Sequence, residues 1–109
     1  MSIDENNCPV RATMEVIGGK WKPVILYYLK TEGVCRFGEL QRFIPHISKK
    51  VLTQELRALE ADGIINRHDY REVPPKVEYS MTDYGRTLKP ILETMANWGN
   101  ERISLKNGL

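Results

Sequence analysis

Apolar residues recur with helical spacing at the beginning of the chain. A first stripe predicts a helix that begins at Pro9 and ends before Gly18-Gly19. A longer stripe predicts a second helix over Lys20–Lys30, followed by a loop over Thr31–Gly33. The two stripes consist of Val10, Met14 and Ile17, and of Trp21, Val24, Ile25, Tyr28 and Leu29.

The middle of the chain predicts two helices joined by a sharp turn. The first is short, Phe37–Phe43, and Pro45 then disfavours helical backbone in the residue before it. The second spans Ser48–Asp62, with Ser48 as its N-cap and Gly63 as its stop signal. The side chains expected to face the core are Leu40, Ile44, Leu52, Leu56 and Leu59.

Strand patterns follow this pair of helices. Val77–Met81 alternates apolar and polar residues, and Ile64–Tyr70 also reads as a strand. The loop between them, Arg71–Lys76, contains two prolines and should project from the sheet. Val34–Arg36 is a candidate third strand. Two helices, a turn and a hairpin predict an α+β, mainly α fold, the winged helix-turn-helix with a two-stranded wing hairpin.

A long final helix is predicted after the hairpin, with Thr82 as its cap. Its apolar side chains outnumber what one small core needs, as do those of the first helix. We therefore expect the two terminal helices to form a dimer interface. The apolar residues of the last helix are Leu88, Ile91, Leu92, Met95, Trp98 and Ile103.

Positive charge is concentrated around the Ser48–Asp62 helix. The 109 residues carry a net charge of +2. Arg36–Arg57 holds five basic and two acidic residues, a net charge of +3, so the remainder sums to −1. A basic local surface on a nearly neutral protein is typical of a small DNA-binding module.

The polar face of the Ser48–Asp62 helix carries side chains that suit DNA. Near its N-terminus, Ser48 and Lys49 are placed for phosphate contacts. Lysine or arginine pairs with guanine, glutamine with adenine, and the threonine methyl group contacts thymine. The base-edge candidates are Lys50, Thr53, Gln54 and Arg57. Backbone contacts are expected from Arg36 and Arg42, and minor-groove or phosphate contacts from Arg71 and Lys76 in the wing.

Four motifs in this order resemble the HxlR family of bacterial transcription regulators, winged-helix proteins related to the MarR group. The similarity covers residues 8–99. It implies a transcriptional regulator, expected to be a repressor, that binds a pseudo-palindromic double-stranded operator as a homodimer through its first and last helices. The motifs are Ile17-Gly18-Gly19-Lys20-Trp21, Arg36-Phe37-x-Glu39-Leu40, Ile47-Ser48-x-Lys50-Val51-Leu52-Thr53-x-x-Leu56 and Val73-Pro74-Pro75-Lys76-Val77-Glu78-Tyr79.

Cys8 stands at the N-cap position of the first helix, directly before Pro9. The helix N-terminus and nearby Arg11 promote thiol reactivity, while Asp4 and Glu5 oppose it. In several HxlR-type regulators a cysteine here senses oxidants, quinones or aldehydes, which the resemblance implies for Cys8. Cys35 is expected to be a small buried apolar residue.

Composition and spacing bound the remaining possibilities. The length fits one domain, 8–106, with frayed termini at 1–7 and 107–109. Two cysteines, an acidic N-terminus and no long apolar run predict a cytoplasmic protein. His46 and His68 lack catalytic partners at recognisable spacing and form no clustered ligand pair with the cysteines, so we expect neither enzyme nor metal site nor cofactor. The alternative function is a winged helix that only contacts proteins, which heparin or random DNA would not retain.

Overall fold

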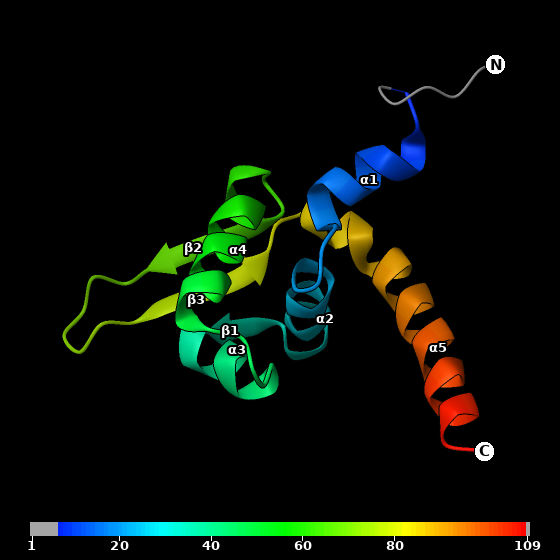
Figure 1. Cartoon of the computed structure of the whole chain (residues 1–109). Coiled ribbons are helices and arrows are strands. Elements are labelled where there is room, and N and C mark those ends of the chain that lie inside the picture. Colours follow the sequence, from blue (N-terminus) through cyan, green and yellow to red (C-terminus); the bar gives the residue numbers. More distant parts are fainter. Residues whose placement is uncertain (1–6, 109) are drawn as a thin grey trace.

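The computed structural model describes residues 7–108, so of the frayed ends expected at 1–7 and 107–109, residues 1–6 and 109 lie outside this range. It confirms the α+β, mainly α winged helix-turn-helix (Figure 1). The elements are α1 (Pro9–Ile17), α2 (Lys22–Glu32), β1 (Val34–Arg36), α3 (Phe37–Phe43), α4 (Lys49–Ala61), β2 (Ile65–Asp69), β3 (Val77–Met81), the 3-10 helix η1 (Gly85–Leu88) and α5 (Lys89–Lys106).

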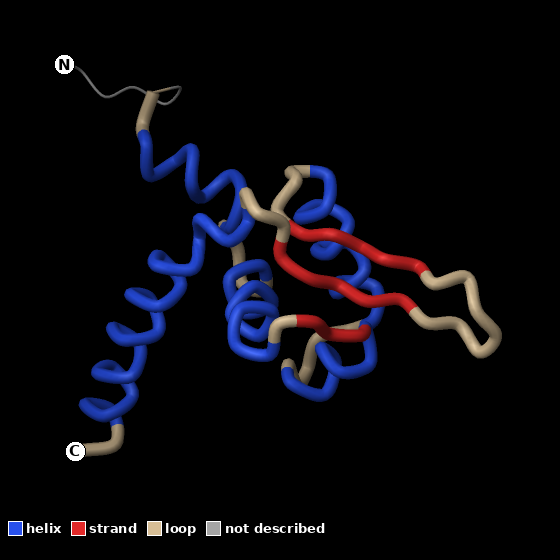
Figure 2. The backbone as a smooth tube through the Cα atoms, turned by 180° about the vertical axis from the view of Figure 1, so that it is seen from behind, coloured by secondary structure: helices blue, strands red, loops and turns tan. Residues whose placement is uncertain are grey.

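The sheet has three antiparallel strands in the order β1-β3-β2. β2 and β3 form the wing, and their connecting loop extends well beyond the body of the molecule (Figure 2). β1 adds a third strand to this hairpin, with Cys35 opposite Tyr79. Since side chains alternate between the two faces along each strand, those of Tyr79, Cys35 and Ile65 all lie on the buried face of the sheet.

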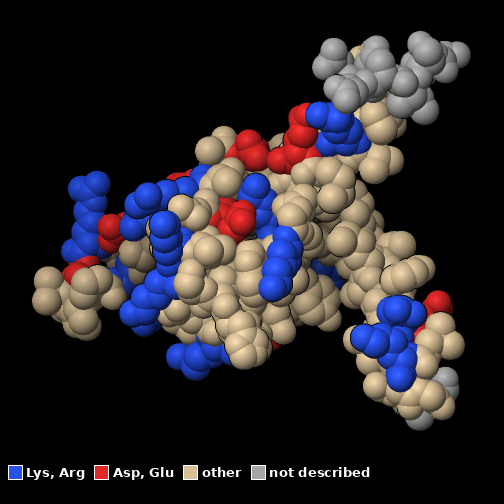
Figure 3. All heavy atoms as spheres, viewed as in Figure 1, with Lys and Arg blue, Asp and Glu red and all other residues tan. Residues whose placement is uncertain are grey.

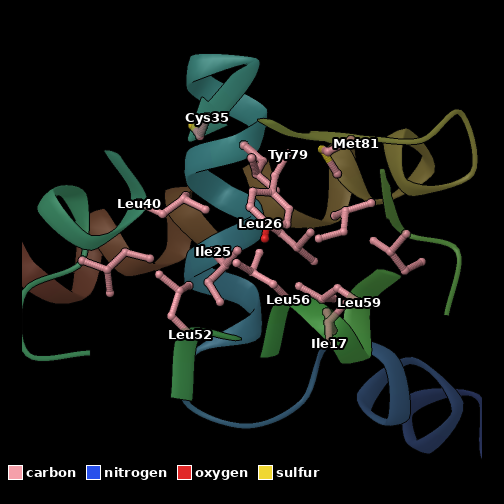
Figure 4. Close-up of a cluster of buried hydrophobic side chains, with 14 of the residues drawn as sticks. Ile17, Ile25, Leu26, Cys35, Leu40, Leu52, Leu56, Leu59, Tyr79 and Met81 are labelled. Atoms are coloured by element: carbon pink, nitrogen blue, oxygen red, sulfur yellow. The ribbon is translucent and has the colours of Figure 1, made fainter. Parts of the chain in front are cut away.

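The core lies between α2, α4 and this face of the sheet (Figure 4). Leu52, Leu56 and Leu59 of α4 are all at most 2% exposed, which confirms the predicted stripe. They meet Ile25 and Leu26 of α2, which runs through the centre of the cluster. The apolar face of α4 is thereby fixed against the core, and its polar face is left outside.

The turn between α3 and α4 follows the sequence prediction. His46 adopts a left-handed backbone conformation (φ 74°) after Pro45. Ser48 is the N-cap of α4, and its Oγ accepts a hydrogen bond from the Val51 N–H at 3.1 Å. Gly63, just beyond the helix, has φ 74°, a conformation that glycine adopts at little cost. Both ends of α4 are thus set by local sequence.

Two predictions about α2 were wrong. The helix runs to Glu32 rather than ending at Lys30, so the expected loop shrinks to its C-cap, Gly33. Val24, expected in the apolar stripe, is 37% exposed, whereas Leu26 is fully buried. α2 packs against β3, α3, α4 and α5 together, so a central helix buries more of its circumference than one stripe.

The start of the last helix also differs from the prediction. Thr82 does not cap α5, which begins seven residues later at Lys89. Its Oγ1 instead accepts a hydrogen bond at 2.8 Å from the N–H of Gly85, the first residue of η1. Gly85 lies so close to β2 that a Cβ there would come within 2.0 Å of the Ile64 carbonyl oxygen. The 3-10 helix η1 thus stands between β3 and α5.

α1 and α5 project from the body as two arms (Figure 1). The radius of gyration is 15.7 Å, against roughly 13 Å for a compact domain of this length. Most apolar side chains of these arms are exposed: Val10 and Met14 on α1, and Ile91, Met95, Trp98, Ile103 and Leu105 on α5. In α5 only Leu92 is buried, so the expected apolar stripe does not close the protomer's own core.

Candidate nucleic-acid interface

The outward face of α4 is polar and basic. Lys49, Lys50, Gln54 and Arg57 are exposed, and Thr53 is half-buried at the edge of this face. The acidic residue of the same stretch, Glu55, is turned away toward α2, where its carboxylate lies 3.7 Å from Lys22 Nζ. The structure therefore brings all five α4 candidates onto one surface, from which Glu55 is turned away, while Glu60 lies at its edge beside Thr53 and Arg57.

Basic side chains also gather in three dimensions around this surface. In Figure 3, several groups of lysine and arginine atoms lie over the side formed by α4 and the wing, with other residues and a few acidic atoms between them. At the helix N-terminus, Ser48 uses its hydroxyl oxygen as the cap, so the neighbouring free N–H groups point outward. Lys49 and Ser48 thus stand where helix dipole and side-chain charge both favour an anion.

A hollow of about 550 Å³ lies at the edge of the contact between α4 and the sheet. Its floor consists of Phe37, Leu56 and Tyr79. Its charged and polar lining consists of Thr53, Arg57 and Glu60 from α4 and Arg67 from β2. Arg67 was missed from the sequence. The strand alternation contains the signal, because Arg67 is two residues from buried Ile65 and so shares the sheet face that α4 covers.

The wing holds its two basic candidates differently. Arg71 is exposed in a left-handed conformation (φ 55°), and its N–H donates to Asp69 Oδ1 at 2.8 Å. Lys76 Nζ lies 4.3 Å from the ring centroid of Tyr70, a cation–π contact. The Tyr70 hydroxyl donates to Glu78 Oε1 at 2.5 Å, and this hydrogen bond is the main cause of the raised pKa of Tyr70.

The two arginines before α4 are separated from one another. Arg42 is exposed in the last turn of α3, next to the turn into α4. Arg36 pairs in register with Glu78, on the sheet face opposite buried Cys35 and Tyr79. Strand alternation therefore places Arg36 on the far side of the sheet from α4, and the structure does not bring it to the polar face of α4.

The two cysteines are free and have different environments. Cys8 is half-buried at the N-cap of α1, as the sequence predicts. Cys35 is buried in β1, and burial raises the pKa of its thiol from 9.0 to about 11, helped by the carboxylates of Glu39 and Glu32. Cys35 is thus the small buried residue expected, held as a neutral thiol at physiological pH.

Across residues 7–108, no helix combines the length and apolar character that a membrane span requires. In the same part of the chain, His, Cys, Asp and Glu side chains form no group of three suited to a metal ion.

Comparison with known proteins identifies the family. The family model described as HxlR-like helix-turn-helix matches residues 16–107. The chain belongs to the HxlR family. A relative from Bacillus subtilis (strain 168), "Uncharacterized HTH-type transcriptional regulator YtcD", is 56% identical over 104 residues, which cover 95% of this chain and 82% of that protein. The resemblance seen in the sequence motifs is confirmed.

Solved structures of similar regulators have the same fold. The crystal structure of YtcD has a TM-score of 0.83 at 56% identity and covers 89% of this chain and 98% of that one. "Redox regulator HypR in its oxidized form" has a TM-score of 0.82 at 52% identity, covering 86% and 96%. Diamide-treated YodB from B. subtilis has a TM-score of 0.70 at 33% identity, covering 86% and 93%. The HxlR chain described here is therefore a helix-turn-helix regulator by family.

Proposed function

We propose that this HxlR protein is a sequence-specific repressor that binds a pseudo-palindromic operator as a homodimer. The observation that carries the proposal is the outward face of α4, where Lys50 and Gln54 stand opposite the buried leucine stripe. A helix so mounted can enter a major groove while its apolar face stays in the core. A regulator of this kind acts where the chromosome is, so we propose a cytoplasmic location.

Within this proposal, α4 supplies most of the sequence reading. Lys50 and Gln54 face straight outward and are the leading candidates for base edges, with Thr53 and Arg57 at their side. Ser48 and Lys49 hold phosphate at the helix N-terminus, and Arg42 reaches the adjoining backbone. Arg71 and Lys76 of the wing contact the flanking minor groove or its phosphates.

The test is selection of bound duplexes from random DNA, followed by measurement of affinity for the selected and for scrambled duplexes. Gln54→Ala should lower the affinity for the selected duplex by roughly 5- to 150-fold and leave scrambled DNA unchanged. Lys49→Ala should weaken binding to both and reduce the salt dependence. If Gln54→Ala kept the full sequence preference, α4 would not be the reading helix.

The exposed apolar faces of α1 and α5 support the homodimer. Trp98, Ile103 and Met95 line α5 at exposures that a monomer in water rarely tolerates together. A groove of about 320 Å³ between α2 and α5, bounded by Val24, Tyr27 and Met95, continues this surface. Two protomers joined there would present two copies of α4 to half-sites one helical turn apart, about 34–36 Å.

We further propose that Cys8 senses oxidants or electrophiles such as quinones and aldehydes. It lies at the N-cap of α1, on one of the two arms assigned to the dimer interface, and it is not fully buried. The neighbours HypR and YodB are described in an oxidised and a diamide-treated form, respectively. Oxidation at this position would alter how the two protomers, and therefore the two α4 helices, are spaced.

Diamide treatment tests this proposal. Oxidised wild-type protein should change its operator affinity and lose the free Cys8 thiol, while Cys8→Ser should keep its affinity. Buried Cys35 provides the matched control, because Cys35→Ala should respond to diamide like the wild type. Unchanged operator affinity after full oxidation of Cys8 would rule out sensing through this residue.

A further inference from the structure

The hollow between α4 and β2 lies where a DNA strand would have to cross the protein. In a duplex the major and minor grooves are separated by one sugar–phosphate backbone. If α4 occupies the major groove and the wing loop reaches the neighbouring minor groove, that backbone passes over the surface between them. This surface is the hollow lined by Thr53, Arg57, Glu60 and Arg67.

The chemistry of the hollow suits one phosphate group. Arg67 and Arg57 approach it from opposite walls, one on β2 and one on α4, and Thr53 adds a hydroxyl donor. Within the described chain, neither arginine side chain has an ion pair or a hydrogen bond in the protein. Two guanidinium groups with free N–H donors around a concave surface can together donate several hydrogen bonds to the oxygens of one phosphate.

We propose that this hollow binds a single backbone phosphate of the operator, with Arg67 and Arg57 as its principal ligands. The inference rests on the proposed function, since it requires α4 in the major groove. It adds Arg67 to the interface and assigns Arg57 and Thr53 to the DNA backbone rather than to base edges. A contact on each side of the strand would fix the angle between the recognition helix and the wing.

Glu60 provides a second test, because removing its charge should change DNA affinity in the direction opposite to the removal of an arginine charge. Its carboxylate lines the same hollow, which therefore has a net charge of +1 from two arginines and one glutamate. A phosphate in the hollow would be repelled by this carboxylate. Glu60→Gln should therefore tighten DNA binding, whereas Arg67→Ala should weaken it.

The experiment combines these variants with duplexes in which one phosphate at a time is replaced by a neutral methylphosphonate. Each half-site should contain one phosphate, between the parts contacted by α4 and by the wing, whose replacement lowers the affinity of the wild-type protein about tenfold or more. At that position Arg67→Ala should show no further loss, because its partner charge is already gone. Arg67→Ala should also lower the salt slope by about one, for selected and scrambled DNA alike.

Controls separate the possible failures. Lys106→Ala removes one positive charge from the far end of α5 (Figure 1) and should leave the methylphosphonate pattern unchanged. Thermal unfolding of Arg67→Ala checks that this variant is folded. The tighter binding expected of Glu60→Gln cannot result from loss of the fold, because unfolding would weaken binding. If Gln54→Ala removes sequence preference but Arg67→Ala and Glu60→Gln change nothing, the phosphate site is wrong and the proposed function stands.

A free inorganic anion could also bind in the hollow, because it offers the same phosphate oxygens as the DNA backbone. Inorganic phosphate, titrated into DNA-free protein and followed at the arginine Nε–H resonances, identifies it. Saturation of Arg57 and Arg67 by free phosphate, together with full affinity for every methylphosphonate duplex, would overturn the assignment to DNA. Absence of saturation, together with one sensitive backbone position, would support it.

Discussion

Trp98 offers the sharpest test of the proposed dimer. It lies on α5 and is 68% exposed in the protomer. A tryptophan side chain offers up to about 250 Å² for burial, so about 170 Å² of it remains for a partner to cover. At about 25 cal/mol per Å², full burial in the dimer would contribute about 4 kcal/mol for each copy as an upper limit.

Trp98→Ala should therefore raise the dimer dissociation constant by at least about 30-fold, since even one truncated side chain at the centre of an interface costs about 2–4 kcal/mol. Sedimentation equilibrium over a concentration series measures this constant, and far-UV circular dichroism checks that the protomer stays folded. Val73→Ala is the matched control, because Val73 is also exposed but lies at the tip of the wing. A Trp98→Ala protein with the wild-type dissociation constant would refute the assignment of α5 to the interface.

Three further predictions concern the protomer itself. Ser48→Ala removes the α4 cap and should lower the free energy of unfolding by about 1 kcal/mol, measured by urea denaturation. Because the pKa of Cys35 is raised from 9.0 to about 11, the folded state keeps the thiol proton to a higher pH than the unfolded state does. The contribution of Cys35 to stability should therefore be complete below pH 9.0 and be lost between pH 9.0 and about 11. In alkaline denaturation the wild type should lose about 2–3 kcal/mol more than Cys35→Ala. Gly85→Ala should lower the melting temperature strongly, because the new Cβ meets the Ile64 carbonyl at 2.0 Å, whereas Gly38→Ala, with open space around it in α3, should not. Unchanged unfolding of Gly85→Ala would contradict the close approach of η1 to β2.

Much of the helix-turn-helix could be predicted because its signals are local. Pro45, the Ser48 cap and Gly63 determine the ends of α4 through backbone preferences that do not depend on distant residues. Leu52, Leu56 and Leu59 define its buried face through spacing alone. The same local rules predicted β3 correctly, since alternation along Val77–Met81 marks which side chains turn inward.

The errors occurred where several elements meet. α2 is surrounded on most sides, so its pattern did not show that Leu26 would be buried and Val24 partly exposed. Thr82 has good capping chemistry, but its hydroxyl instead donates to the Gly63 carbonyl and accepts from the Gly85 N–H. Such contacts join residues far apart in the chain, and no local pattern records them.

Motifs and spacing along the chain were enough to indicate the family, the two-faced helix α4 and most of the basic residues around it. Which of these residues share a surface followed from the packing of α4 against the sheet. In the folded protein Arg36 lies on the far side of the sheet from α4, and Arg67 lines the same hollow as Arg57. The physical reason is that a helix and a strand each distribute side chains by their own period, and only their packing sets one face against another.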